Sequence, residues 1–235
     1  MTTFVLVPGA WLAAWAWDDV SAGLAAAGHD VHAVTLRGLA ERAGEVPPAS
    51  VDLSSHMADV ADLIEGAGLD DVTLVVHSYA GALGAMIADR VPQRLGRLVY
   101  LASRPVPAAW SMFALMGAAA EQGIRAMAVA AGDPDRWPPP SDEMLDRYYP
   151  MHGLTGDLLT RFRARATPHP IATQAQPVGL TGAGDAVRRR VIWCEGDGPV
   201  PELLGVPPAE VRVLATGHWP LLTHPGLVVA ALLEE

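Results

Sequence analysis

The segment Val75-Val76-His77-Ser78-Tyr79-Ala80-Gly81 places a serine where an apolar strand is expected to turn directly into a helix. A serine in this position is lifted above the sheet on a tight turn, where its hydroxyl can act as the nucleophile of acyl transfer. The main-chain N–H of Tyr79, at the helix start, would face the oxyanion that forms on an attacked carbonyl. The alternative interpretation is that Ser78 only caps the helix, as serine often does.

The base that such a serine needs is predicted from the segment Thr216-Gly217-His218-Trp219-Pro220. This segment follows the last expected strand and precedes the last expected helix. A histidine there comes last in the chain order nucleophile, acid, base, and a loop can hold its imidazole near the serine hydroxyl. We therefore expect His218 to be the general base rather than a packing histidine.

The acid is expected after the preceding strand, in Cys194-Glu195-Gly196-Asp197-Gly198-Pro199-Val200. Asp197 has a turn-forming glycine on each side, and the alternative is that it only makes the turn. Glu195 is the rival acid. Another place for an acid is the end of the fourth expected strand, but Leu101-Ala102-Ser103 holds no carboxylate. These observations favour Asp197.

Other residues of the predicted site follow the first and fourth strands. The loop Pro8-Gly9-Ala10-Trp11 is expected to supply a second oxyanion N–H from Ala10. The substrate pocket is assigned Trp11, Trp219 and Arg104, where the arginine could clamp a substrate carboxylate. A basic stripe of Arg161, Arg163 and Arg165 is interpreted as solvated surface.

Short apolar runs alternate with helical patterns along most of the chain, which predicts a mostly parallel sheet with helices on both faces. Strands are expected at 4–7, 30–36, 72–76, 98–101, 191–194 and 211–215, and helices at 15–27, 54–64 with Ser54 as N-cap, 79–89 and 227–233. The alternation breaks at about 104–185, where no clear strand is visible. We expect a single domain over 1–235, with a helical insertion at 104–185 that covers the sheet edge as a cap.

Composition excludes several classes of function. The net charge of −10 argues against nucleic-acid and membrane partners, and the single cysteine, Cys194, excludes an internal disulfide. No signal peptide and no apolar run of the ~20 residues that span a membrane is visible, so the expected location is cytoplasmic. No Cys/His cluster or phosphate-binding loop indicates a metal or an organic cofactor, so we expect neither. The expected assembly is a monomer or homodimer.

The phrases FVLVPGAW, LVVHSYAG, TPHPIATQAQP and GHWPLLTHP resemble the small α/β hydrolases related to plant methylesterases and hydroxynitrile lyases, in a bacterial branch. The resemblance covers nearly the whole chain and is weakest at about 105–160. It implies the α/β-hydrolase fold, with a six-stranded parallel core and a helical cap over the active site. It also implies Ser78 as nucleophile, His218 as base, Asp197 as acid, and the N–H groups of Ala10 and Tyr79 as oxyanion hole.

Two departures from the family pattern affect the predicted function. Pro8 replaces the usual histidine before Gly9, and Val76 replaces the usual glycine before His77. Both are expected to crowd or stiffen the floor of the active site. The chain also lacks lysine, and the related hydroxynitrile lyases use a lysine to hold the leaving cyanide, so we discount that activity.

The predicted function is hydrolysis of an ester or thioester of a small organic molecule, such as a secondary metabolite, through an acyl-enzyme on Ser78. The substrate would be free or carried as a thioester on a carrier protein. One alternative is acyl transfer to an acceptor other than water, which a cap that excludes water would favour. The others are a non-hydrolytic lyase or cyclase and a ligand-binding protein on the same fold.

Overall fold

Six parallel strands form the centre of the molecule. The computed structural model describes residues 1–202 and 205–234. Its main sheet has the strand order β2-β1-β3-β4-β7-β8, with every neighbouring pair parallel. The strands are β1 (Thr3–Val7), β2 (Asp30–Ala33), β3 (Val72–His77), β4 (Leu95–Leu101), β7 (Arg188–Cys194) and β8 (Val211–Leu214). The expected parallel α/β fold and its six strands are confirmed.

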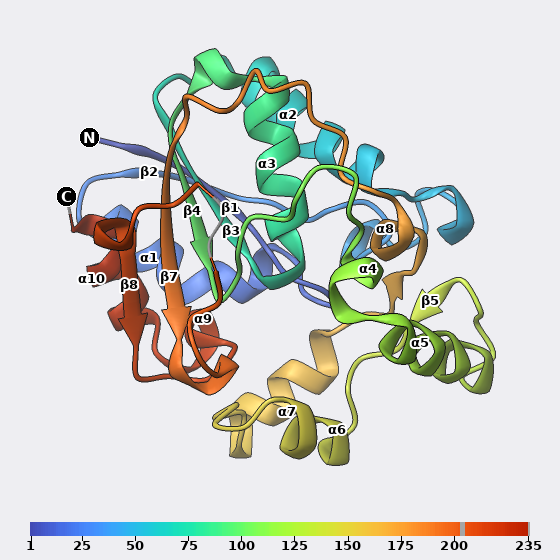
Figure 1. Cartoon of the computed structure of the whole chain (residues 1–235). Coiled ribbons are helices and arrows are strands. Elements are labelled where there is room, and N and C mark those ends of the chain that lie inside the picture. Colours follow the sequence, from blue (N-terminus) through green and yellow to red (C-terminus); the bar gives the residue numbers. More distant parts are fainter. Residues whose placement is uncertain (203–204, 235) are drawn as a thin grey trace.

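Two pairs of helices flank this sheet. Helix α1 (Asp18–Ala26) packs against α10 (Pro225–Leu233), and α2 (Leu53–Gly66) packs against α3 (Gly81–Arg90) (Figure 1). β3 is buried at every position because both of its faces are covered, which explains its unbroken apolar sequence. Single turns complete this part of the chain: η1 (Ala14–Trp17), η2 (Ala40–Arg42), η3 (Pro48–Ser50), η4 (Ser78–Ala80), η5 (Pro92–Arg94), η6 (Glu195–Asp197), η7 (Pro208–Glu210) and α9 (Pro220–Thr223).

The start of α2 differs from the prediction. Its N-cap is Asp52, not Ser54, and the Asp52 side chain accepts a hydrogen bond from the Ser55 N–H. The Ser55 hydroxyl in turn bonds the Asp52 N–H, so the two residues form a reciprocal capping box. Ser54 lies in the first turn of the helix, where Gln176 of the inserted segment bonds both its main chain and its hydroxyl.

The segment between β4 and β7 is mainly helical. It contains α4 (Met112–Met116), α5 (Ala118–Ala130), α6 (Asp142–Tyr148), α7 (Gly156–Arg165) and α8 (Ala172–Ala175). In Figure 1 this segment extends from the strand-bearing body at the right and below. It also holds a short antiparallel ladder that the sequence did not reveal, formed by β5 (Arg136–Trp137) and β6 (His169–Pro170). A two-residue strand is too short to show a period.

The basic stripe on α7 lies at the solvated surface, where its arginines pair with acidic groups. Arg161 and Arg165 both reach Asp18 at the start of α1, at 3.2 and 3.4 Å. Their guanidinium groups also lie over the Trp15 ring, 5.8 and 5.0 Å from its centroid. Arg163 pairs with Asp142 within the inserted segment. Arg161 and Arg165 therefore connect the insertion to α1. Each of these ion pairs is exposed and contributes little stability by itself.

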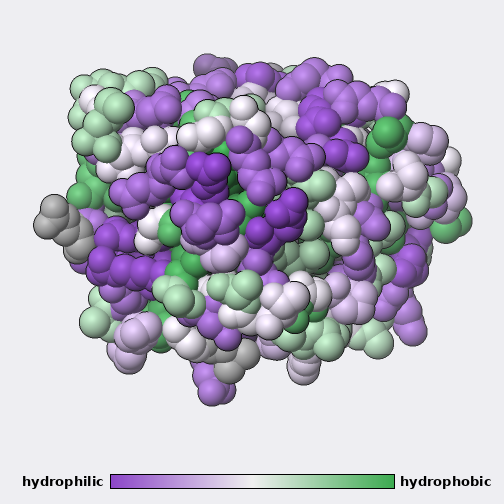
Figure 2. All heavy atoms as spheres, turned by 90° about the horizontal axis from the view of Figure 1, so that it is seen from above, coloured by the Kyte–Doolittle hydropathy of each residue, from purple (hydrophilic) through white to green (hydrophobic). Residues whose placement is uncertain are grey.

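The surface seen from above mixes hydrophilic and hydrophobic residues, with strongly hydrophilic side chains at its centre (Figure 2). In the part of the chain that the structure describes, no helix has the length and apolar character needed to cross a membrane.

Val76 does not crowd the active site as expected. It is fully buried, and its γ-methyl groups lie 3.0 and 3.3 Å from where a Cβ on Gly84 of α3 would stand. The missing side chain of Gly84 therefore leaves the space that Val76 fills, between β3 and the helix that follows it. The valine and the glycine are a matched packing pair.

We expect Val76→Gly to lower the free energy of unfolding by about 2–4 kcal/mol, because it removes buried methyl groups and places glycine in a strand. Gly84→Ala should destabilise the wild type through the contact with Val76. In the Val76→Gly background the same change should be less destabilising, because the contacts with the Val76 γ-methyl groups are gone and the contact with Leu98 Cδ1 remains. Urea unfolding of the four proteins measures this coupling. Additive effects, within about 0.5 kcal/mol, would contradict the pairing.

Candidate active site

Ser78 occupies a strained turn between β3 and η4. Its φ is 52°, in the left-handed region that residues with a side chain rarely adopt. The turn is held from β4, where the Ser103 hydroxyl donates a hydrogen bond to the Ser78 carbonyl at 2.6 Å. A side chain on Gly81 would collide with the Ser103 hydroxyl and would lie 2.7 Å from the Arg104 carbonyl. The small residue after the turn is therefore required for the two loops to meet.

Ser78, His218 and Asp197 form a continuous hydrogen-bonded chain. The Ser78 hydroxyl lies 2.8 Å from His218 Nε2, and His218 Nδ1 lies 2.7 Å from Asp197 Oδ1. Because the carboxylate can only accept, Nδ1 carries the proton and Nε2 is free to accept the serine proton. The His218 and Asp197 side chains are each 14% exposed. Glu195 is exposed and makes no contact with His218 within the described residues.

The acid and base loops approach each other through glycines. The Gly196 N–H donates to the Thr216 carbonyl at 3.0 Å. A Cβ on Gly196 would lie 2.9 Å from the Gly217 Cα and 2.7 Å from the Pro150 carbonyl. The residues that precede Asp197 and His218 are therefore glycines because the two backbones are in contact.

Two residues that the sequence did not assign to the site support His218. His77 is fully buried, and its Nε2 donates to the main-chain carbonyl of His218 at 2.8 Å. Burial lowers the pKa of His77 to about 3, so this ring is a neutral hydrogen-bond donor and not a second base. Tyr149, from the inserted segment, lies with its ring 5.1 Å from the His218 ring, and burial raises its pKa. Nothing in the sequence around Tyr149 indicates this contact.

The expected oxyanion donors flank the serine. Tyr79 directly follows Ser78, and Gly9 lies so close that a Cβ there would stand 2.9 Å from the Ser78 Cβ. Within residues 1–202 and 205–234, the Ala10 N–H has no hydrogen-bond acceptor. An unused amide beside the serine is the feature that an oxyanion hole requires.

A cavity of about 210 Å³ opens over the triad. Besides Ser78, Asp197 and His218 it is lined by Ala102, Ser103, Arg104, Val106, Met112, Leu115 and Trp193. The lining includes one of the three residues that the sequence assigned to the pocket, Arg104, but neither Trp11 nor Trp219. Trp11 is buried against Trp137 of β5, with ring centroids 4.3 Å apart. Trp219 packs edge-on against the His218 ring at 5.2 Å. Both therefore support the site from behind and do not face this cavity.

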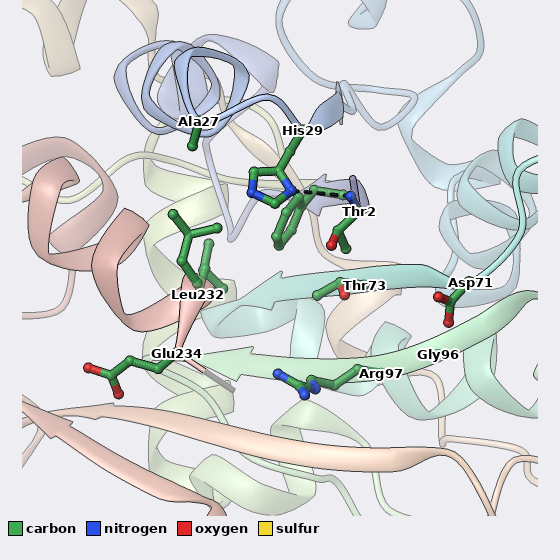
Figure 3. A pocket seen from close by; sticks show the side chains of 11 residues that line it. Thr2, Ala27, His29, Asp71, Thr73, Gly96, Arg97, Leu232 and Glu234 are labelled. Atoms are coloured by element: carbon green, nitrogen blue, oxygen red, sulfur yellow. Dashed lines mark hydrogen bonds between the residues drawn. The ribbon is translucent and has the colours of Figure 1, made fainter.

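A larger cavity of about 530 Å³ lies at the amino ends of β1, β3 and β4 (Figure 3). Thr2, Thr73 and Arg97 line it, and the His29 ring accepts a hydrogen bond from the Thr2 N–H at its edge. The serine lies at the opposite, carboxyl ends of the strands, where parallel α/β sheets bind their ligands. Among the described residues, no group of three His, Cys, Asp or Glu could hold a metal ion.

Comparisons with known proteins agree with this fold. A family profile described as the alpha/beta hydrolase family matches residues 4–232. A carbendazim hydrolyzing esterase from Nocardioides sp. (strain SG-4G) is 33% identical over 202 residues, which are 86% of this chain and 83% of the relative. Methylesterase 7 from Arabidopsis thaliana is 36% identical over 106 residues, which are 43% of this chain and 39% of the relative.

Solved structures show the same fold. An extracellular α/β-hydrolase from a Paenibacillus species, described as homologous to tobacco salicylic acid binding protein 2, superposes with a TM-score of 0.82 at 19% identity. That match covers 99% of this chain and 98% of the other. The methylesterase MES16 from Arabidopsis superposes with a TM-score of 0.75 at 20% identity, again over 99% of this chain and 98% of the other.

The fold and the family profile define a class of enzymes built on a parallel sheet. In this chain Ser78 lies at the turn between a strand and a helix. The chain belongs to the α/β hydrolase family, and its relatives place it among the members that hydrolyse esters. The resemblance to plant methylesterases that the sequence indicated is confirmed.

Asp197→Asn is expected to lower kcat by about 10⁴-fold, because it loses the carboxylate that fixes the His218 tautomer and stabilises its imidazolium. Glu195→Gln is the matched control. The Glu195 carboxylate is two residues from Asp197 in the sequence and is exposed, so we expect kcat to change less than threefold. Steady-state kinetics on both folded variants tests this difference. A larger loss in Glu195→Gln would transfer the role to Glu195, and mild losses in both would indicate a Ser–His dyad.

Proposed function

We propose that this protein hydrolyses an ester of a small organic molecule through an acyl-enzyme on Ser78. The observation that carries the proposal is the hydrogen-bonded chain from the Ser78 hydroxyl through His218 to Asp197, at 2.8 and 2.7 Å. The cavity above it supports a small substrate, since about 210 Å³ lies below the range of pockets that enclose drug-sized ligands.

In the first half of the reaction, the Ser78 oxygen attacks the ester carbonyl carbon while His218 Nε2 takes the hydroxyl proton. The carbonyl oxygen becomes an oxyanion beside the N–H groups of Ala10 and Tyr79. The bond to the alcohol oxygen then breaks, and His218 gives its proton to the leaving alkoxide. Alcohol departs, and the acyl group remains bonded to Ser78.

In the second half, water takes the place of the alcohol. His218 removes a proton from the water molecule while the water oxygen attacks the acyl carbon. The bond to the Ser78 oxygen breaks, the serine recovers its proton from His218, and a carboxylic acid departs. The Asp197 carboxylate stabilises the imidazolium in both halves.

The substrate class follows from the cavity and the relatives. The lining is mainly apolar side chains from β7, α4 and the loop after β4, which favours an aliphatic or aromatic group beside the scissile ester. The relatives named methylesterases favour a small alcohol such as methanol as the leaving group. We therefore propose methyl and other short-chain alkyl esters of small apolar acids as substrates.

The test compares wild type with Ser78→Ala on a panel of methyl esters, matched thioesters and the same acyl donors with added alcohol acceptors. Ser78→Ala should lose at least 10⁴-fold in kcat. It should fold normally, since only one hydroxyl is removed. A fluorophosphonate probe should label the wild type at Ser78 and leave the variant unlabelled. Equal turnover by both proteins would refute the serine mechanism, and faster product formation with an alcohol acceptor would establish acyl transfer instead.

Arg104 allows a prediction about substrate charge. It lines the cavity, and none of the described residues pairs with its guanidinium. A carboxylate on the substrate could therefore bind it through charge-assisted hydrogen bonds. Arg104→Met should lower kcat/KM about 10- to 100-fold for an ester that carries a second carboxylate, and about threefold or less for the neutral ester of the same size. Equal losses on both esters would remove this role.

A further inference from the structure

Three buried rings pack together behind the turn that carries the nucleophile. They are His56 of α2, Tyr79 of η4 and His169 of β6, exposed by 0%, 2% and 0%. The Tyr79 ring centroid lies 4.5 Å from that of His169 and 6.0 Å from that of His56, in both cases nearly edge to face. None of the three rings lines the cavity above Ser78.

Hydrogen bonds determine which nitrogen of His56 carries its proton. Nε2 lies 2.8 Å from the main-chain carbonyl of Arg37, which can only accept, so Nε2 is protonated. Nδ1 is then unprotonated, and it accepts a hydrogen bond from the Tyr79 hydroxyl at 3.0 Å. Burial lowers the pKa of His56 to about 4, so this neutral form is the one present near neutral pH.

His169 is held in a similar way from the inserted segment. The Thr173 hydroxyl donates to the Pro170 carbonyl at 2.7 Å, and its oxygen therefore accepts from His169 Nε2 at 2.9 Å. Burial lowers the pKa of His169 well below its usual value, which keeps the ring neutral against Tyr79. The Tyr79 side chain is thus bonded at its hydroxyl and packed along its ring.

Near Tyr79 the local backbone anchors the carbonyl end of the peptide group that carries the Tyr79 N–H, because the Ser103 hydroxyl and the Gly81 N–H both donate to the Ser78 carbonyl. The turn η4 has only three residues, and no side chain caps its amino end. Ser78, immediately before it, has a strained φ of 52°. The Tyr79 Cα lies at the other end of this planar peptide group, and the contacts of the Tyr79 side chain hold that end.

We propose that His56 and His169 are positioning residues that lock the Tyr79 side chain, so that the Tyr79 N–H stays aimed at the oxyanion. This inference rests on the proposed function, because it assigns the Tyr79 amide to the oxyanion hole. It also gives the motif TPHPIATQAQP a role, since His169 and Thr173 both belong to it. The inserted segment and the nucleophile turn then share one buried contact.

The first test removes one polar group at a time. Tyr79→Phe keeps the ring and loses the hydroxyl, and His56→Leu removes the acceptor together with the Nε2 bond to the Arg37 carbonyl. Removing a whole oxyanion donor costs about 10²- to 10³-fold in kcat, and we expect a displaced donor to cost about 10- to 100-fold, with KM changed less than threefold. The double variant should lose no more than the larger single loss, because both changes break the same bond.

Tyr100→Phe is the control for removal of a buried tyrosine hydroxyl as such, because the Tyr100 hydroxyl lacks the hydrogen bond that the Tyr79 hydroxyl makes with His56. Tyr100 is also a fully buried tyrosine, on the neighbouring strand β4, and it does not line the cavity. Its variant should keep wild-type kcat. A general effect of deleting a buried hydroxyl would lower kcat in Tyr100→Phe as well, and that result would overturn the proposal.

A second readout does not depend on catalysis. The order parameter of the residue 79 amide, measured by ¹⁵N NMR relaxation, should be lower in Tyr79→Phe and His56→Leu than in wild type. The amides of Leu74 and Val75 in β3 serve as internal references and should not change. An unchanged order parameter at residue 79, or unchanged kcat in both variants, would overturn the positioning role. Absence of fluorophosphonate labelling in the wild type would instead count against the serine mechanism, and the order parameter would still decide the positioning role.

Discussion

The strained backbone at Ser78 is the constraint on which the rest of the site depends. A non-glycine residue at a φ of 52° costs roughly 1–3 kcal/mol, and such a conformation persists only where the surroundings impose it. Here the surroundings are β3 below the turn, the Ser103 hydroxyl on its carbonyl and the bare Cα of Gly81 beneath the neighbouring loop. The same contacts that impose the strain also raise the serine hydroxyl to the position where His218 reaches it.

Close backbone approach recurs throughout the site. Gly9 meets Ser78, Gly196 meets Gly217, and Gly84 receives Val76. In each case a side chain is absent so that another group can occupy its place. His77 completes the arrangement because it anchors the His218 main chain from beneath. The hydrogen-bonded triad therefore has a rigid base in which no component depends on a long flexible side chain.

Much of this could be predicted from the sequence, for definite physical reasons. The central strands β1 and β3 are buried on both faces, so they appear as apolar runs, and the nucleophile, acid and base follow β3, β7 and β8 in a fixed order. What could not be predicted depends on tertiary contacts. The fit of Val76 against Gly84 joins two elements whose packing the sequence does not display, so from the sequence alone the valine indicates an obstruction. The burial of Trp11 against Trp137 depends on a ladder of two-residue strands, which no periodicity can reveal.

The contacts of the inserted segment with the site are the part of the structure that the sequence predicts least well. His169 belongs to the motif TPHPIATQAQP, but the motif does not show what its ring contacts, and Tyr149 reaches His218 from a segment with little pattern. Both meet the site only after the chain has folded back over the sheet. Helix caps are similarly undetermined, since Asp52 and Ser54 are both suitable caps and only the capping box with Ser55 selects the first.

The central claim is that an acyl group passes through Ser78. The most direct test mixes the enzyme with an excess of an ester that it hydrolyses and stops the reaction by rapid quenching. Mass spectrometry of the enzyme's peptides then shows whether any residue carries the acyl group. The account predicts that the peptide containing Ser78 gains the mass of the acyl group at early times and loses it as the ester is consumed. Steady turnover with no mass gain on any peptide, or an acyl group on a different residue, would contradict it.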